Sequence, residues 1–201
     1  MSLMWRPTQT GRTSSTEFCQ GATCRGDEKL IDVIKPSALE LKEKVISSPL
    51  TIFYSNLETC GECYSYFEQE LGEQQFYPPG SPANLSNRLF AQYHAQYPEE
   101  YHTSLVKSLI SGTSVARVLF VTVAFGVGID VPTVERVIQI GIPYTMEDFL
   151  QETGRAGRNG NSAISVLYYN SYDISKVSSP GYTCYLYFGK EINRVGNWTG
   201  A

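Results

Sequence analysis

Two arginines three residues apart are the part of this sequence best suited to bind an anion. Arg155 and Arg158 lie in the segment 151–158, which reads Gln-Glu-Thr-Gly-Arg-Ala-Gly-Arg. A spacing of three places both side chains on one helical face, with only small residues between them. A guanidinium binds phosphate oxygens through a planar set of donors and stays charged when desolvated. A solvated basic turn is the alternative, but it does not need the small residues, so the segment favours a phosphate site.

A second segment, residues 121–130, combines several groups that bind ligands. It offers the Thr122 hydroxyl, the Asp130 carboxylate, and two glycines, Gly126 and Gly128, between them. Glycine lets a ligand approach the backbone closely. Two glycines alone are a weak signal, and a plain strand exit with Asp130 as a cap explains the same residues.

A third segment, Tyr54-Ser55-Asn56, follows a short apolar run. Ser and Asn are favoured N-cap residues, so a purely structural role explains them. The functional alternative is that Ser55 and Asn56 hold a phosphate at the helix N-terminus.

These segments need a scaffold that brings them together. Short apolar runs predict strands at 50–54, 89–94, 116–123, 134–140 and 163–169. Apolar residues at helical spacing predict helices at 57–71, from Pro98 to about residue 110, and at 146–153, with a proline-rich loop at 75–87. Strands that are apolar on both faces and alternate with helices predict a single α/β lobe whose mostly parallel sheet has helices on both faces. Ligands of such a sheet gather at the carboxyl ends of its strands.

The chain is expected to divide into three parts. Residues 1–45 form a polar leader without regular structure followed by a linker helix that opens at Pro36, residues 46–172 form the lobe, and residues 173–201 form a short tail.

Composition restricts the function. The 201 residues carry a net charge of −4, which is the wrong sign for a protein that binds nucleic acid mainly through a basic surface. A few phosphate contacts through amides and hydroxyls remain compatible with it. The most apolar stretch, 115–131, contains Arg117 and does not predict a membrane span. The N-terminus has no secretory signal, and the five cysteines suit a reducing compartment, so we expect an intracellular protein.

In order along the chain, the segments 54–56, 122–130 and 151–158 resemble motifs IV, V and VI of superfamily-two helicases. The amino-acid sequence of the last segment resembles motif VI of the RecQ family. Residues 93–95, Tyr-His-Ala, are similar to a triplet of RecQ proteins. The resemblance covers about residues 50–170. It implies a RecA-like fold, the second lobe of an ATP-dependent 3′–5′ DNA helicase, and a nuclear location.

The resemblance also implies roles for individual residues. Arg158 would be an arginine finger placed against the γ-phosphate of ATP held by another lobe, and Arg155 would support it. Gln151 would link nucleotide state to the bound strand. Asp130 and Gly128 would help to close the nucleotide cleft. The residues that would contact DNA phosphates are Thr122, Ser55, Asn56 and Gly126.

Two features depart from that family. Gln96-Tyr97 and His102 replace a Gly-Leu and an Arg that usually follow the triplet, and the loop at 75–87 is longer than usual. These differences concern fine DNA contacts more than the fold.

The sequence contains neither Gly-x-x-x-x-Gly-Lys-Ser/Thr nor Asp-Glu-x-His after an apolar strand. We therefore expect ATP and magnesium to be held mainly by a first RecA-like lobe, in cis or in trans, and this chain alone to be inactive. A non-catalytic nucleic-acid or protein binding module derived from a helicase is the alternative, and RNA is a lesser alternative to DNA.

No zinc is expected. Cys184 stands roughly where the first ligand of the zinc-binding region of the family would fall, but no cysteine follows it. Cys60 and Cys63 have ligand spacing, yet Cys60 lies on the apolar face of its predicted helix and a closed zinc site needs four ligands.

Overall fold

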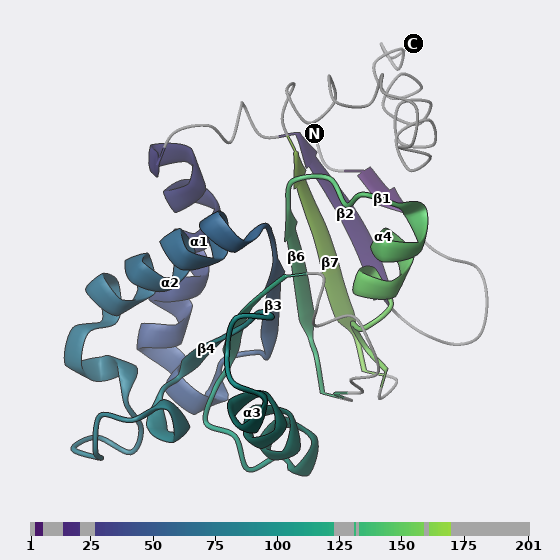
Figure 1. The fold of residues 1–201 in the computed structure, drawn as a ribbon. Helices are drawn as coiled ribbons and strands as arrows, with labels where there is room; N and C mark the ends of the chain where they lie inside the picture. The colour runs from purple at the N-terminus through teal and green to yellow at the C-terminus, as the bar shows by residue number, and fades with distance from the viewer. Residues whose placement is uncertain are drawn as a thin grey trace, which may run out of the picture.

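The computed structural model describes residues 3–5, 14–20, 27–122, 131, 133–158 and 161–169. Its strands are β1 (Leu3–Trp5), β2 (Ser14–Gln20), β3 (Thr51–Tyr54), β4 (Phe90–Tyr93), β5 (Val118–Val121), β6 (Arg136–Ile140) and β7 (Ala163–Tyr169) (Figure 1). Its α-helices are α1 (Asp27–Lys44), α2 (Leu57–Leu71), α3 (Glu99–Ser111) and α4 (Met146–Thr153), and short 3-10 turns span Val45–Ser47, Gly72–Gln75 and Leu85–Asn87.

The strands form one sheet in the order β1-β2-β7-β6-β3-β5-β4. All neighbouring pairs are parallel except β1 with β2. The chain leaves β3 for β4 at the edge, returns through β5, and then crosses to β6 on the other side of β3. Ligand sites of parallel sheets form where the strand order reverses in this way, at the carboxyl ends of the strands. The predicted mostly parallel sheet is confirmed.

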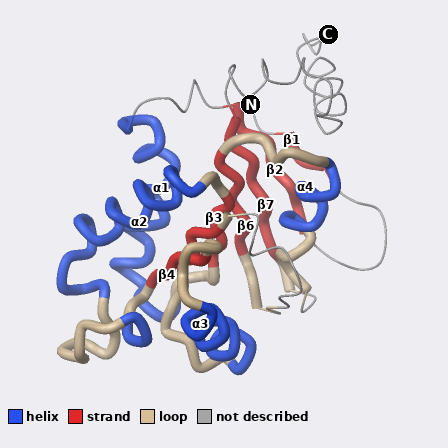
Figure 2. The backbone as a smooth tube through the Cα atoms, in the orientation of Figure 1, coloured by secondary structure: helices blue, strands red, loops and turns tan. Residues whose placement is uncertain are grey.

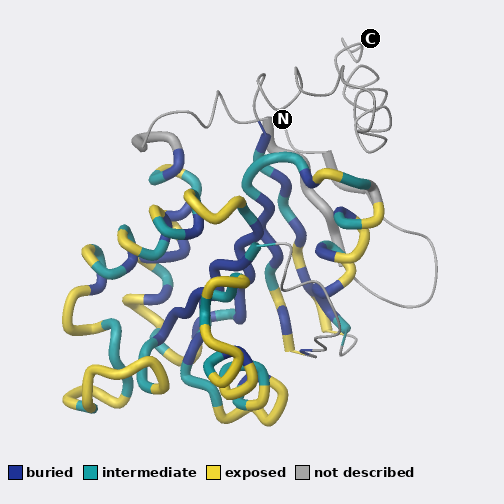
Figure 3. Tube along the Cα trace, in the orientation of Figure 1, coloured by how far each residue is buried: buried dark blue, intermediate teal, exposed yellow. Residues whose placement is uncertain are grey.

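Helices cover both faces of the sheet, as predicted. α1 and α2 pack on one face around an aromatic core, in which the Phe120 ring lies 4.9 Å from that of Phe67 and 5.4 Å from that of Phe53. The opposite face buries Ile52 and Val137 against Leu109 of α3 and other residues of the same cluster. Figure 3 shows the buried positions running through the central strands, between the helices.

Local signals explain where the helices begin and end. Asn56 caps α2, Thr145 and Asp148 form a reciprocal capping box at the start of α4, and α3 begins after Pro98. Gly112 ends α3 in the left-handed conformation, at φ 71°, which glycine adopts without strain.

The prediction for the N-terminal part was wrong in two respects. α1 begins at Asp27, and Pro36 lies inside it rather than at its start. The apolar face of α1 continues through Pro36, because Leu30, Ile34 and Ala38 are all buried against α2 and the sheet. The leader also contains regular structure, since Ser14–Gln20 pairs in parallel with β7. The tail, 173–201, lies outside the described residues.

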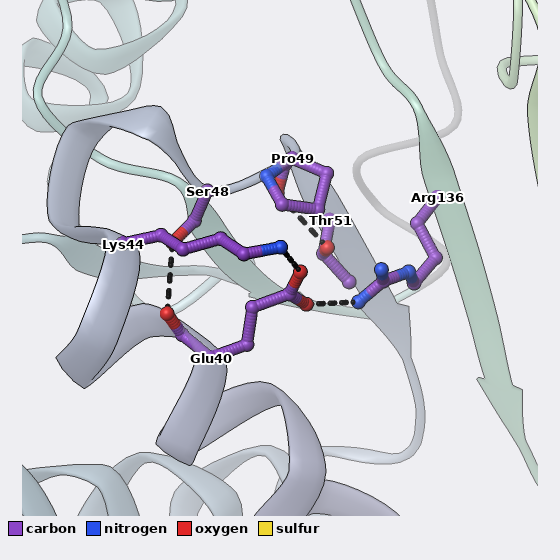
Figure 4. A network of polar contacts seen from close by, with 6 residues as sticks. All are labelled: Glu40, Lys44, Ser48, Pro49, Thr51 and Arg136. Carbon is purple, nitrogen blue, oxygen red and sulfur yellow. Dashed lines mark hydrogen bonds and ion pairs between the residues drawn. The ribbon is translucent and has the colours of Figure 1, made fainter.

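A polar network ties α1 to the amino end of β6 (Figure 4). Glu40 accepts hydrogen bonds of 2.8 Å from both Arg136 and Lys44, and its carbonyl accepts from the Ser48 hydroxyl. Partial burial raises the pKa of the Glu40 carboxyl, but the two cations outweigh that effect and leave the pKa below its usual value. Glu40 therefore joins the helix to the strand as a carboxylate.

None of the helices in the described segments is both long enough and apolar enough to cross a membrane.

Candidate functional site

The residues that directly follow β3 and β5, Ser55 and Thr122, lie at the carboxyl edge of the sheet. The Ser55 amide donates a 3.1 Å hydrogen bond to the Val121 carbonyl, and the Thr122 amide donates one of 3.2 Å to the Tyr93 carbonyl. Ser55 and Thr122 are half-buried, and Asn56 is exposed. Figure 2 draws the strands of the sheet in red and the loops that join them to the blue helices in tan. The structure thus brings together three of the residues that the sequence singled out.

Asn56 and Ser55 have structural roles here. The Asn56 side chain accepts a 2.9 Å hydrogen bond from the Thr59 amide, which caps α2. The Ser55 hydroxyl donates to the Asn56 carbonyl and lies 3.2 Å from the Cys60 sulfur. Both polar side chains are therefore already ordered at the N-terminus of α2, where unpaired amides favour an anion.

The arginine turn, residues 154–158, reaches the amino end of β6. α4 starts after the carboxyl end of β6, but it runs back along the sheet. The Gly157 amide therefore donates its 2.9 Å hydrogen bond to the carbonyl of Val134, two residues before β6 begins. The sequence led us to expect ligand-binding segments at the carboxyl ends of the strands, but Gly157 lies near the amino end of β6.

Gly157 gives the turn its shape. Its φ is +69°, and a Cβ at this position would lie 2.9 Å from the Asn161 carbonyl oxygen and 3.1 Å from the Ala163 Cβ. Only glycine fits both the backbone conformation and the space.

The sequence suggested that the two arginines are equally accessible. They are not, because the chain bends at Gly157. Arg155 is buried, whereas Arg158 is half-buried and donates from Nε to the Gly154 carbonyl at 3.1 Å. The small residues between the two arginines therefore do not leave Arg155 open to a ligand. Gln151 is exposed on α4.

A buried polar cluster, Tyr54, Gln139, Glu152 and Arg155, lies between the sheet and α4. Each of the four is at most 4% exposed. Tyr54 and Gln139 are paired in register on β3 and β6, so their side chains point to the same face. Gln139 Nε2 donates a 2.6 Å hydrogen bond to Glu152 Oε2.

The electrostatics of this cluster are coupled. Burial raises the pKa of the Glu152 carboxyl to about 7, and Asp148 adds to the effect, while the Gln139 amide and the Arg155 charge oppose it. Burial also raises the pKa of the Tyr54 hydroxyl, against the positive charges of Arg155 and Arg158. The charge of Arg155 thus lowers the pKa of both an acid and a phenol, against the larger effect of burial.

Sequence reasoning missed Tyr54, Gln139 and Glu152 as parts of the site. One signal was present, because Gln139 is a polar residue within the apolar strand Val137-Ile138-Gln139-Ile140. A glutamine that is buried in this way needs a polar partner.

Three predicted residues, Gly126, Gly128 and Asp130, lie outside the described residues, as does Cys184. Cys60 and Cys63 are buried in α2, and burial raises the pKa of both thiols. Among the residues that the structure describes, no three metal-binding side chains gather in one place.

Comparison with known proteins agrees with this geometry. Residues 52–160, more than half of the chain, match the family model described as helicase conserved C-terminal domain. The putative ATP-dependent DNA helicase Q1 of Caenorhabditis elegans is 44% identical over 87 residues, which are 43% of this chain and 14% of that protein. The ATP-dependent helicase SGS1 of Saccharomyces cerevisiae is 40% identical over 84 residues, which are 42% of this chain and 6% of that protein.

Among solved structures, Mycobacterium smegmatis helicase Lhr bound to ssDNA and AMP-PNP superposes with a TM-score of 0.60 at 21% identity, over 84% of this chain and 21% of that one. At this identity the likeness shows the fold, which is a RecA-like lobe. The matched region is a small fraction of each of these longer proteins. The chain therefore belongs to the helicase conserved C-terminal domain family, and the lobe that it carries is of RecQ type.

Proposed function

We propose that this chain supplies the second motor lobe of an ATP-dependent DNA helicase of 3′–5′ polarity. The observation that carries the proposal is the arginine turn of RecQ type, in which Arg155 is anchored inside the lobe and Arg158 is held nearer the surface. An arginine presented in this way suits the stabilisation of charge that develops during phosphoryl transfer.

In this proposal ATP and magnesium are held mainly by a first RecA-like lobe, in cis or in trans. Arg158 acts as the arginine finger against the γ-phosphate, and Arg155 supports it. Gln151 links the nucleotide to the bound strand, while Asp130 and Gly128 help to close the nucleotide cleft. The two lobes close on ATP and reopen after hydrolysis, so that contacts with the DNA strand form and break in turn.

The strand itself is proposed to cross the carboxyl edge. Ser55, Asn56, Thr122 and Gly126 would contact DNA phosphates, since Ser55 and Thr122 directly follow neighbouring strands at that edge. With a net charge of −4, the chain is expected to neutralise few phosphates, so binding should be weak and its dependence on salt shallow. A nuclear location is proposed from the kinship with RecQ helicases alone.

The test uses purified chain with and without the first lobe of a RecQ-type relative. Alone, the chain should show no ATP turnover stimulated by DNA. With the first lobe added, turnover should appear, and Arg158→Ala should reduce it by about 10³-fold or more, as for other arginine fingers. Lys107→Ala, at an exposed position on α3, is the control and should leave turnover unchanged.

Turnover that survives Arg158→Ala would exclude the finger role, and turnover by the chain alone would contradict the need for a first lobe. Tight binding of single strands at high salt, without turnover in any combination, would instead support the non-catalytic binding module. Parallel titrations with single-stranded DNA and RNA of the same sequence decide between the two substrates.

A further inference from the structure

The turn between β4 and α3, residues 94–98, is held by a histidine of α3. The His102 ring is buried and stacks on the Tyr93 ring, with the two centroids 4.1 Å apart and the two planes at 22°. The Nε2 atom of the same ring lies 3.0 Å from the His94 carbonyl oxygen. His102 therefore contacts two consecutive residues, the last of β4 and the first of the turn.

The hydrogen bond between His102 and His94 has only one possible direction. A carbonyl oxygen can only accept, so Nε2 of His102 carries a hydrogen and donates it. The His94 carbonyl also accepts a 3.0 Å hydrogen bond from the Tyr97 amide, which closes the turn. Both lone pairs of this oxygen are then engaged. The Glu99 carboxylate does not compete for the ring, because it is 4.0 Å from Nδ1 and 90% exposed.

Tyr97 fixes the other side of the turn. Its ring lies 4.7 Å from the rings of both His94 and Tyr101. Its hydroxyl donates a 3.4 Å hydrogen bond to Oε1 of Gln92, which is buried. The Gln92 amide donates in turn to the Cys60 carbonyl of α2, at 3.2 Å. The turn is thus connected to α2 through Tyr97 and to α3 through His102.

The end of β4 carries the contact that places Thr122 at the carboxyl edge. The Thr122 amide donates its 3.2 Å hydrogen bond to the Tyr93 carbonyl, and Tyr93 is paired in register with Val121 of β5. Among the strands that the structure describes, β4 has a neighbour on one side only. Such a strand opens more readily than a central one, because fewer hydrogen bonds hold it. The contacts of His102 act on the end of β4 to which Thr122 is bonded.

We propose that His102 is a positioning residue, which fixes the end of β4 by donating to the His94 carbonyl and thereby fixes Thr122 at the carboxyl edge. Tyr97 and His102 are two of the positions at which the sequence departs from the family that it resembles, and both hold the same turn. A contact of Thr122 with a DNA phosphate rests on the proposed function. The positioning of Thr122 rests only on the contacts within this lobe.

The first measurement is amide hydrogen exchange by NMR, in the full chain without DNA. His102→Phe keeps an aromatic ring beside Tyr93 and removes the donor. The amides of Tyr97 and Thr122 should then exchange about fivefold to tenfold faster, because local opening becomes easier when one hydrogen bond is lost. His102→Gln keeps a donor at nearly the same distance from the backbone, so it should restore both rates to within about twofold. The Phe53 amide, in the central strand β3, should change in neither variant.

Ser108→Ala is the matched control on the same helix. The Ser108 hydroxyl donates a 2.8 Å hydrogen bond to the Leu105 carbonyl, away from the turn. This variant also removes one hydrogen bond from a side chain to a carbonyl, but it should leave the exchange of the Tyr97 and Thr122 amides unchanged.

The second measurement is the binding of single-stranded DNA, followed by fluorescence anisotropy. His102→Phe should weaken binding by about threefold or more, because Thr122 is no longer held in place. His102→Gln and Ser108→Ala should bind as the unaltered chain does.

Exchange of the Tyr97 and Thr122 amides that is unaffected by His102→Phe would overturn the proposal. So would an increase that His102→Gln does not reverse. Faster exchange at Phe53 as well would also overturn it, because that result indicates a general loss of stability and not a local effect. If the exchange rates change as expected and DNA affinity does not, His102 positions Thr122 but Thr122 does not contact DNA. If the unaltered chain binds no DNA, the proposed function fails, and the exchange rates still decide the role of His102.

Discussion

Gln139 and Glu152 join the sheet to α4 through a 2.6 Å hydrogen bond that lies inside the core. The donor is the last but one residue of the apolar strand β6, and the acceptor lies near the end of α4, just before the arginine turn. Such a buried link constrains geometry more strongly than a surface contact, because neither partner can exchange the other for water.

The ionisation of Glu152 should make stability depend on pH. Its folded pKa of about 7 lies above the usual value, so the folded state binds the proton more tightly than the unfolded chain does. The contribution of Glu152 to stability is therefore fully present at acidic pH and is lost as pH rises from the unfolded pKa, near 4.3, through 7. The free energy of unfolding from urea titrations should fall by up to about 4 kcal/mol over this range from this group alone.

Glu152→Gln removes that ionisation. The difference in unfolding free energy between the unaltered chain and this variant should shift in favour of the variant as pH rises from 5 to 8. Glu147→Gln, at an exposed position on the same helix, is the control. A difference that stays constant over this range contradicts an ionisable Glu152 near neutral pH.

Gly157 should not tolerate a side chain. Gly157→Ala forces a positive φ on alanine and brings its Cβ within 2.9 Å of the Asn161 carbonyl oxygen, so a loss of about 1–3 kcal/mol is expected in thermal or urea unfolding. Gly61→Ala gives the opposite sign, because Gly61 is inside α2 with open space around its Cα and alanine is the better helix former by about 1 kcal/mol. Similar effects at the two sites would show that the turn is not formed as described.

The Glu40–Arg136 ion pair should stabilise the docking of α1. Because the folded pKa of Glu40 is lowered, its contribution is present above the unfolded pKa, near 4.3, and is lost as pH falls through the folded value. A double-mutant cycle with Glu40→Gln and Arg136→Gln should give a coupling of about 1 kcal/mol at pH 7, since the pair is only partly buried. Glu43→Gln, on the exposed side of α1, should show no coupling to Arg136→Gln. The same coupling at pH 7 and pH 3 would argue against an ionic origin.

Asn56→Asp separates the capping role of this residue from its proposed contact with DNA. Aspartate caps a helix as well as asparagine and favours the helix dipole, so stability should change by less than about 0.5 kcal/mol. A carboxylate at a phosphate contact repels the strand, so binding of single-stranded DNA in fluorescence anisotropy should weaken by about fivefold or more. Asn84→Asp, at the cap of the short turn Leu85–Asn87, should leave binding unchanged. An unchanged affinity of Asn56→Asp for single-stranded DNA would show that Asn56 only caps α2.

The sequence was sufficient for the lobe and for the order of its motifs. Strand and helix periodicity located β7 and α4 at their observed bounds, because a short, mostly apolar run differs clearly from a segment with a helical repeat. The same periodicity did not locate the start of α1, since Pro36 is a strong local signal that packing against α2 overrides.

Only the tertiary structure decided which arginine is buried. In the sequence, Arg155 and Arg158 are equivalent members of a small-residue segment. The Gly157 amide bonds to the carbonyl of Val134, and Ala156 packs in the same core cluster as Tyr54, about a hundred positions away in the sequence. Periodicity reports the burial of a whole face, but the direction of one side chain at a turn depends on long-range contacts that local spacing does not contain.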